Sequence, residues 1–496
     1  MKYVNLSKKI EDQNFVFIII SFFLSFIFFK GRLGGDDLQS FIFAFNLIET
    51  FNYNLPDYLQ DPSNGWQFSH RKIWILQNSI LISIFKVVNS FIFFDLKYFS
   101  NYFCGWLLTF YSFYSFFLFL KILLINKINI NLSILISISV FFGTSLISFF
   151  TGAYIESLVV LLILLRLISK NKKIKFLIDV LLVLIKPYYF IVVICLVYDD
   201  LKISRKSIFY LFSIFIIVVI EKILTFNTFS SFVTTLPVKI EVEFMIKNIF
   251  NMFFSLGFGI FFTSTVLFFL ILIGSEFKTL FKFSILFLFI IILSAITFWH
   301  GQSPGGRYLV SCLFIFVPEI VESLKRLNNY KIKNIFFIAI FLITILNLPS
   351  LEYRNTNIKN YSDNAVTKGV AESPSDRDIK AFPINDFNFN NIIFAQNIFW
   401  NKIFKKENKI IKIKNYSFKV KNVYPMTGLK RIMFITENRL DYVNEKLILD
   451  VNSSILIILK ILYYFTFIFV FIIFLFSLNN CLKYNEKNKH NNPNLQ

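Results

Sequence analysis

The sequence LIDVLLVLIKPYYFIVVICLV, residues 177–197, is an apolar stretch that Lys186 and Pro187 interrupt near its middle. It is just long enough for one membrane crossing, which takes about 20 largely apolar residues. Both flanks, KNKKIK and DDLKISRKS, nevertheless carry the Lys and Arg clusters that mark the cytoplasmic side. The stretch therefore predicts two short helices, 175–186 and 188–199, with both outer ends inside. Lys186 would then lie in the outer half of the bilayer, where a buried cation needs an anionic partner such as a lipid phosphate.

The composition of the whole chain is typical of a membrane protein. Of 496 residues 56% are hydrophobic, 69 are Phe, and the mean hydropathy is +0.63, well above the values of soluble domains. The net charge of +21 comes from short basic clusters between apolar runs, which favours membrane topology over nucleic-acid binding. The four cysteines lack the paired spacing of a disulfide framework or a zinc site. The first apolar segment has no small-residue cleavage site, which predicts an uncleaved span.

We predict an all-α polytopic membrane protein with about twelve transmembrane helices, judged by the length that a span requires. The predicted segments are 15–29, 98–120, 131–150, 154–169, 175–186, 188–199, 207–224, 257–274, 283–299, 308–324, 334–348 and 454–478. With this count the basic clusters of the short loops all fall on one side, which makes that side cytoplasmic.

The first external loop, 30–97, contains a segment, 73–94, that is apolar enough to span the membrane. A crossing there would invert every later loop and move the basic clusters outside. We therefore predict that 38–53 and 73–94 are amphipathic helices in or near the outer interface.

The sequence of the C-terminal part predicts a second domain outside the membrane. Residues 349–453 contain strand-like runs such as IIKIKNYSFKVKNVY, which predict a small β-containing extracytoplasmic domain. The expected order is a transmembrane catalytic domain at 1–348, this domain, a final helix at 454–478 and a cytoplasmic tail at 479–496.

Two adjacent carboxylates follow the first predicted span. In GGDDLQSF, residues 34–41, two glycines precede Asp36 and Asp37, and glycines allow the backbone to turn sharply and approach a ligand. A carboxylate at the membrane surface can serve as a general base or bind a divalent cation. Ordinary solvated loop carboxylates are the alternative at such a site.

Three further charged or titratable residues are predicted on the same outer face. His300 and Arg307 belong to WHGQSPGGRYL, and Glu156 belongs to TGAYIES. The planar guanidinium of Arg307 suits phosphate oxygens, with an interfacial Arg that reaches to water as the alternative. Glu156 could hold a cation or an acceptor hydroxyl, or simply be solvated.

The order of these motifs resembles the bacterial GT-C glycosyltransferases related to protein mannosyltransferases and aminoarabinose transferases. The similarity runs over roughly residues 15–320 through GGDDLQSF, TGAYIES, LIKPYYF, NMFFSLGFGIFFTSTVLFFLILIG and GQSPGGRYL. The chain departs from the family where DDLQSF lacks the usual Tyr and where FSLGFGIFFTST lacks the family's prolines and Arg.

The resemblance implies an inverting transfer of a sugar from a polyprenyl-phosphate donor to an acceptor hydroxyl of a glycan, lipid or protein. Asp36 takes the place of the catalytic carboxylate and Asp37 that of its neighbour, while Arg307 and Lys186 would bind the donor phosphate. Glu156 and His300 are possible supporting residues. A divalent cation is the one cofactor to consider. The reaction would take place on the outer face of the cell membrane.

A multi-span transporter or a flippase of lipid-linked glycans is the alternative function. Secondary transporters are commonly built from internal repeats, and we find none in the sequence.

Overall fold

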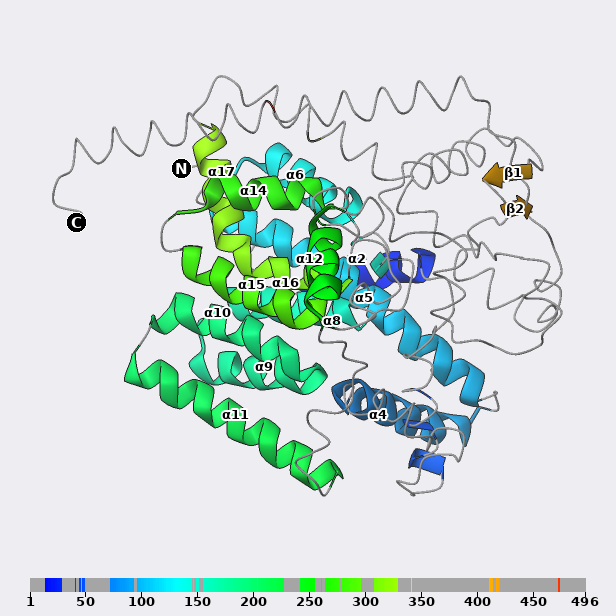
Figure 1. Cartoon of the computed structure of the whole chain (residues 1–496). Coiled ribbons are helices and arrows are strands. Elements are labelled where there is room, and N and C mark those ends of the chain that lie inside the picture. Colours follow the sequence, from blue (N-terminus) through cyan, green and yellow to red (C-terminus); the bar gives the residue numbers. More distant parts are fainter. Residues whose placement is uncertain are drawn as a thin grey trace, which may run out of the picture.

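Figure 1 shows a computed structural model of the chain. The structure describes residues 14–28, 72–92, 96–144, 155–202, 204–226, 241–254, 264–276, 279–295, 307–328, 410–413 and 416–419, together with a few single positions elsewhere.

The described part of the chain is helical apart from one small β-hairpin, which confirms the predicted helical class. The α-helices are α2 (Asn14–Phe28), α4 (Lys72–Asn89), α5 (Leu96–Ile125), α6 (Ile130–Phe142), α8 (Glu156–Ile168), α9 (Lys172–Ile185), α10 (Phe190–Leu201), α11 (Arg205–Phe226), α12 (Val242–Phe254), α14 (Thr265–Gly274), α15 (Leu280–Ser294), α16 (Arg307–Cys312) and α17 (Val317–Asn328). Two 3₁₀ helices, η3 (Pro187–Tyr189) and η6 (Leu313–Phe316), and two strands, β1 (Ile410–Ile413) and β2 (Tyr416–Lys419), complete the described elements.

One helix among those described, Phe103–Ile125 within α5, is both long and apolar enough to cross a membrane. Shorter apolar helices occur at Phe15–Ser25, Ile75–Asn89, Ile130–Phe142, Thr265–Gly274 and Leu280–Ser294. The predicted number of spans therefore stays a prediction. The predicted segments 334–348 and 454–478 lie outside the described residues, apart from single positions.

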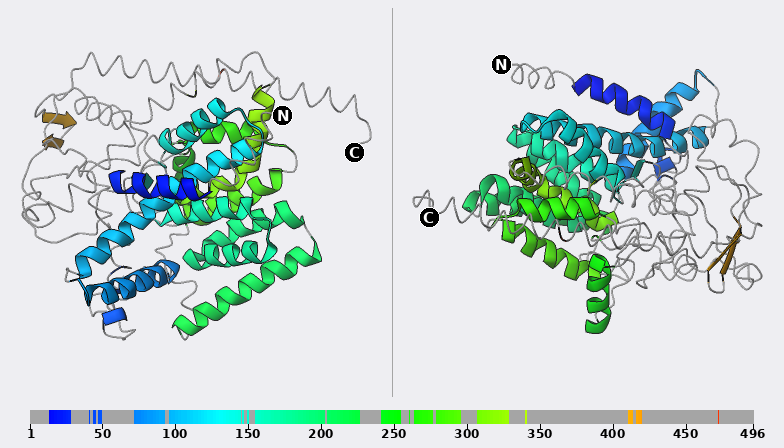
Figure 2. Two further views of the ribbon diagram at one scale, coloured as in Figure 1. Left: turned by 180° about the vertical axis from the view of Figure 1, so that it is seen from behind. Right: turned by 90° about the horizontal axis from the view of Figure 1, so that it is seen from above.

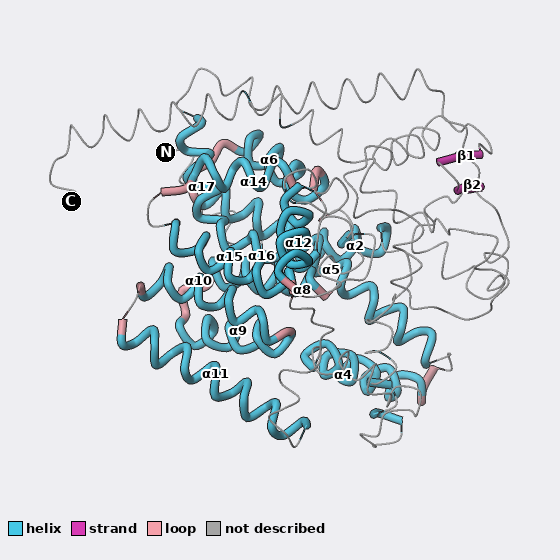
Figure 3. The backbone as a smooth tube through the Cα atoms, viewed as in Figure 1, coloured by secondary structure: helices cyan, strands magenta, loops and turns pink. Residues whose placement is uncertain are grey.

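The interrupted stretch folds into a helical hairpin. α9 ends at Ile185, the 3₁₀ turn η3 covers the Pro187 region, and α10 begins at Phe190. The Lys175 ammonium on α9 lies 2.8 Å from the Asp200 carboxylate at the end of α10, so the two distal ends meet. The predicted break at Lys186–Pro187 into two short helices is confirmed, and the cytoplasmic location of their outer ends stays a prediction. Figure 3 shows the short connections around this hairpin.

The hairpin packs among its sequence neighbours and a later helix. α8 and α11 pack against α9, while α15 packs against α10. α2 lies along α5 at an edge of the bundle (Figure 2). The buried core is aliphatic and aromatic and includes Val159 and Ile163 of α8, Val193 of α10 and Phe289 of α15.

α14 and α17 approach each other closely. A Cβ atom placed on Gly274 would overlap the backbone carbonyl of Glu319. Small residues permit this kind of backbone contact between helices in membranes. Gly274 therefore sets the distance at which α17 packs.

One local prediction was wrong. α6 ends at Phe142, capped by Gly143, whereas the predicted segment continued to 150. The stretch between the predicted segments 207–224 and 257–274 contains α12, in which Ile246 is exposed and Met252 is buried.

The first external loop agrees with its predicted helices where it is described. α4 covers most of the predicted segment 73–94, and the described residues between 41 and 49 are helical. Lys86 of α4 forms an ion pair with Glu49 at 3.2 Å, which joins the two segments.

A β-hairpin lies within the run that predicted strands in the C-terminal part. β1 pairs with β2 in an antiparallel register in which Ile410 faces Lys419 and Ile413 faces Tyr416. Most of the predicted domain 349–453 lies outside the described residues.

Candidate functional site

The structure brings together two of the predicted site residues, Glu156 and Lys186. The Lys186 ammonium lies 2.7 Å from the Glu156 carboxylate, and both side chains are buried, with relative exposures of 4% for Lys186 and 0% for Glu156. Lys186 also lies over the ring of Tyr188, 5.6 Å from its centroid. We call Glu156 and Lys186 the tip pair.

Local sequence explains the position of both residues of the tip pair. Pro187 cannot continue α9, because it lacks an N–H and disfavours a helical residue before it, so Lys186 takes an extended backbone at the end of α9. Glu156 is the first residue of α8, where a carboxylate is favoured by the helix dipole. The anionic partner expected for Lys186 is therefore supplied by the protein.

α16, which begins at Arg307, packs against α8. Glu156 of the tip pair is the first residue of α8. The backbone of Arg307 therefore belongs to a helix that packs on α8, while its side chain is outside the described part of the structure.

The remaining predicted site residues, Asp36, Asp37 and His300, lie outside the described residues. Among the side chains that the structure describes, no group of three His, Cys, Asp or Glu residues could hold a metal ion. The residues predicted to bind a divalent cation, Asp36 and Asp37, are not among those searched.

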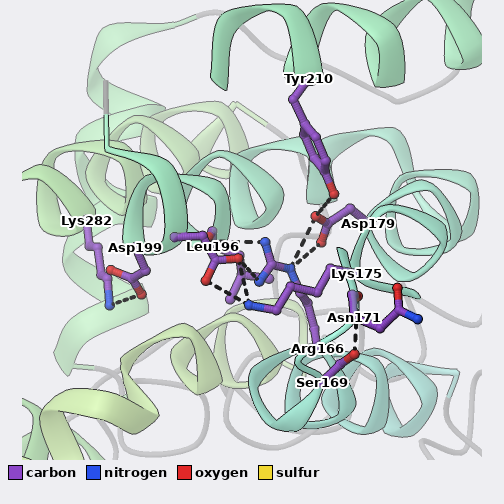
Figure 4. A network of polar contacts seen from close by, with 10 residues as sticks. Arg166, Ser169, Asn171, Lys175, Asp179, Leu196, Asp199, Tyr210 and Lys282 are labelled. Carbon is purple, nitrogen blue, oxygen red and sulfur yellow. Dashed lines mark hydrogen bonds and ion pairs between the residues drawn. The ribbon is translucent and has the colours of Figure 1, made fainter. Parts of the chain in front are cut away.

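A second charged region connects the opposite ends of the same helices (Figure 4). Arg166 of α8 donates from Nε to Asp179 at 3.0 Å and from Nη1 to Asp200 at 2.6 Å. The Tyr210 hydroxyl donates to Asp179 at 2.8 Å, and Lys175 donates to Asp200 at 2.8 Å. We call these five side chains the base network, and they join α8, α9, α10 and α11.

The carboxylate of Asp200 lies just beyond the predicted span 188–199 and is partly exposed. Burial alone would raise its pKa. The hydrogen bond from Lys175 and the charge of Arg166 outweigh that effect, so the pKa of Asp200 lies below its ordinary value.

The neighbouring carboxylate, Asp199, belongs to a different ion cluster. Lys282 of α15 lies 2.6 Å from Asp199 and 2.9 Å from Glu319 of α17. Two adjacent carboxylates at the C-terminus of a helix are disfavoured by the helix dipole. The cations on both sides offset this effect and attach the end of α10 to α8, α15 and α17.

The sequence analysis missed the base network and the Lys282 cluster. A signal was present, because ionisable residues inside apolar segments need partners, and Arg166, Asp179 and Lys282 are such residues. Their partners lie on other helices, so spacing along the chain does not identify them.

Searches of protein-family models, of curated proteins and of solved structures gave no match to this chain. The chemistry of the tip pair and the sequence motifs around it are therefore the basis for a function.

Proposed function

We propose that the chain is a membrane glycosyltransferase that moves a sugar from a polyprenyl-phosphate donor to an acceptor hydroxyl on the outer face of the cell membrane, with inversion. The observation that carries the proposal is the buried Glu156–Lys186 ion pair at the turn of the α9–α10 hairpin. The order of the sequence motifs supplies the reaction class.

The dimensions of the hairpin suit a lipid-linked substrate. α9 has 14 residues, which at about 1.5 Å per residue gives roughly 21 Å, less than the hydrocarbon thickness of about 30 Å. With its base at the cytoplasmic side, the hairpin would end inside the outer half of the bilayer. A phosphate group attached to a polyprenyl chain can reach that depth, whereas a nucleotide sugar in the cytoplasm cannot.

Lys186 would bind the phosphate of the donor. An ammonium has three donors, and a phosphate that forms as the glycosidic bond breaks gains negative charge, which a fixed cation stabilises. Glu156 would hold Lys186 in place before the donor binds. Arg307, at the start of α16, would add a second cation with a fork that fits two phosphate oxygens.

The catalytic step is assigned to the carboxylate pair after α2. Asp36 would accept the proton of the acceptor hydroxyl while its oxygen attacks the anomeric carbon. The bond from that carbon to the phosphate oxygen breaks, and the polyprenyl phosphate leaves. Asp37 would support Asp36, directly or by holding a divalent cation.

The experiment compares Asp36→Asn and Asp37→Asn with wild-type protein in nanodiscs. It measures transfer of labelled sugar from a panel of polyprenyl-phosphate donors to cell-envelope extract. Loss of a general base lowers rates about 100- to 10,000-fold, so Asp36→Asn should lose nearly all transfer, whereas donor binding should be unchanged. Asp37→Asn should lose less.

Two outcomes contradict the proposal. If both variants transfer sugar at the wild-type rate, the carboxylate pair is not catalytic. If wild-type protein moves labelled donor between the leaflets of liposomes and transfers no sugar, the chain is a flippase.

A further inference from the structure

The N-terminal half of α4 buries two polar side chains and exposes several apolar ones, although Ile75 and Ile82 are also buried. Asn78 and Ser79 have relative exposures of 0% and 6%, whereas Leu76, Ile80 and Ile84 have 57%, 55% and 52%. A helix on a water-soluble protein shows the reverse pattern. In a membrane this arrangement directs apolar side chains to lipid and polar side chains to a site inside the protein.

The inner face of α4 carries polar atoms without hydrogen-bond partners. In the part of the chain that the structure describes, Gln77 Nε2, Asn78 Nδ2, Asn78 Oδ1 and Ser79 Oγ are all buried and make no hydrogen bond. Gln77 Oε1 accepts a hydrogen bond from the Tyr111 hydroxyl at 2.8 Å, which fixes that amide. Buried amides without partners are unfavourable, and their grouping in three successive residues indicates a ligand. We call Gln77, Asn78 and Ser79 the α4 polar strip.

The α4 polar strip belongs to the helix that borders the hairpin. α4 packs against α5 and α9. The N-terminal end of α4, which carries the strip, lies toward the end of α9 that leads into Lys186 (Figures 1 and 2). The α4 polar strip therefore lies on a helix that packs on both α5 and the hairpin.

We propose that the α4 polar strip binds the hydroxyl groups of the lipid-linked sugar, an inference that rests on the proposed function. An Asn amide and a Ser hydroxyl each offer a donor and an acceptor, which is what a sugar hydroxyl requires. The strip has no charge, so it suits a neutral hexose or pentose rather than an acidic sugar. Lys186 then binds the phosphate, and the α4 polar strip forms hydrogen bonds with the hydroxyl groups of the sugar.

The test measures binding of two probes to the full chain in nanodiscs: a polyprenyl phosphate, and the same lipid carrying a neutral hexose. Asn78→Leu keeps the size of the side chain and removes its polar atoms. Asn89→Leu makes the same change at the other end of α4 and is the matched control. Thermal unfolding of each variant shows whether it folds.

Wild-type protein and Asn89→Leu should bind the hexose-bearing lipid more tightly than the bare lipid. Asn78→Leu should lose about tenfold in affinity for the hexose-bearing lipid, as expected for one or two neutral hydrogen bonds. Its affinity for bare polyprenyl phosphate should stay within about twofold, because Lys186 is unchanged.

Other outcomes separate this inference from the proposed function. If wild-type protein binds both lipids equally, or if a folded Asn78→Leu keeps the preference for hexose, the strip does not bind sugar and the inference is wrong. If Asn78→Leu raises the melting temperature and leaves the sugar preference unchanged, the Asn78 amide is merely hydrated and binds no sugar. That result also overturns the inference. If wild-type protein binds neither lipid, the proposed function fails and the inference falls with it.

Discussion

The tip pair and the base network both include a residue of α8, Glu156 and Arg166. These two residues are ten positions apart, which corresponds to about 15 Å along the helix. The two sites nevertheless use different cations. At the base, the planar fork of Arg166 contacts two carboxylates from α9 and α10. At the tip, Lys186 contacts Glu156 as a single ammonium. An Arg fork fixes the direction of its partners, whereas a Lys ammonium can reorient among several acceptors. The comparison teaches that the base holds helices in a fixed arrangement, whereas the proposed function requires Lys186 of the tip pair to exchange Glu156 for a ligand.

Removing Asp179 should have the largest effect on stability. Asp179→Leu removes one of the two carboxylates that balance the positive charge of the buried Arg166 guanidinium. It also removes the hydrogen-bond acceptor of the Tyr210 hydroxyl. Breaking a buried ion pair costs about 3–5 kcal/mol, so we expect a loss of about 3 kcal/mol in the free energy of unfolding, measured by denaturation in detergent.

The control for this variant is Lys175→Met, which removes the more exposed cation of the same network. A partly exposed ion pair is worth about 1 kcal/mol or less, so this variant should stay close to wild type. Equal losses for both variants would show that the base network does not depend on its buried part.

The tip pair should show the opposite behaviour when both of its charges are removed. The double variant Glu156→Gln with Lys186→Met leaves no uncompensated buried charge, and such replacements are often neutral. We expect stability within about 1 kcal/mol of wild type and a loss of roughly 10- to 100-fold in binding of polyprenyl phosphate, as for one charge-assisted hydrogen bond. A stable double variant that binds the lipid normally would show that the tip is purely structural.

The smallest expected effect is the pH dependence that Asp200 contributes. The pKa of Asp200 is lowered in the folded protein, so its stabilising contribution is present above the ordinary pKa of about 3.9 and is lost as the pH falls through the lower folded value. Unfolding curves between pH 6 and pH 3 should therefore fall more gently for Asp200→Asn than for wild type. Parallel curves would contradict the assignment.

The sequence predicted the hairpin and the location of Lys186 because these features are local. Lys186–Pro187 interrupts an apolar run, and the flanking charges require both ends to share a side. The partner of Lys186 could not be predicted, because Glu156 comes from a helix thirty residues earlier. Periodicity describes one helix at a time, whereas ion pairs between helices depend on how those helices pack.

The α9–α10 hairpin also has a consequence for biogenesis. If the chain spans the membrane as proposed, the hairpin, whose two ends lie together, leaves the orientation of α11 unchanged, and a chain that lacked it would keep the same predicted arrangement of inside and outside. Neither α9 nor α10, with 14 and 12 residues, has the length of an independent membrane segment, which is about 20 residues. In the proposed membrane setting the two helices must therefore enter the bilayer as one unit during synthesis. The ion pair between Asp200 and Arg166 of α8 can form once α10 has been made, whereas that between Asp199 and Lys282 requires α15.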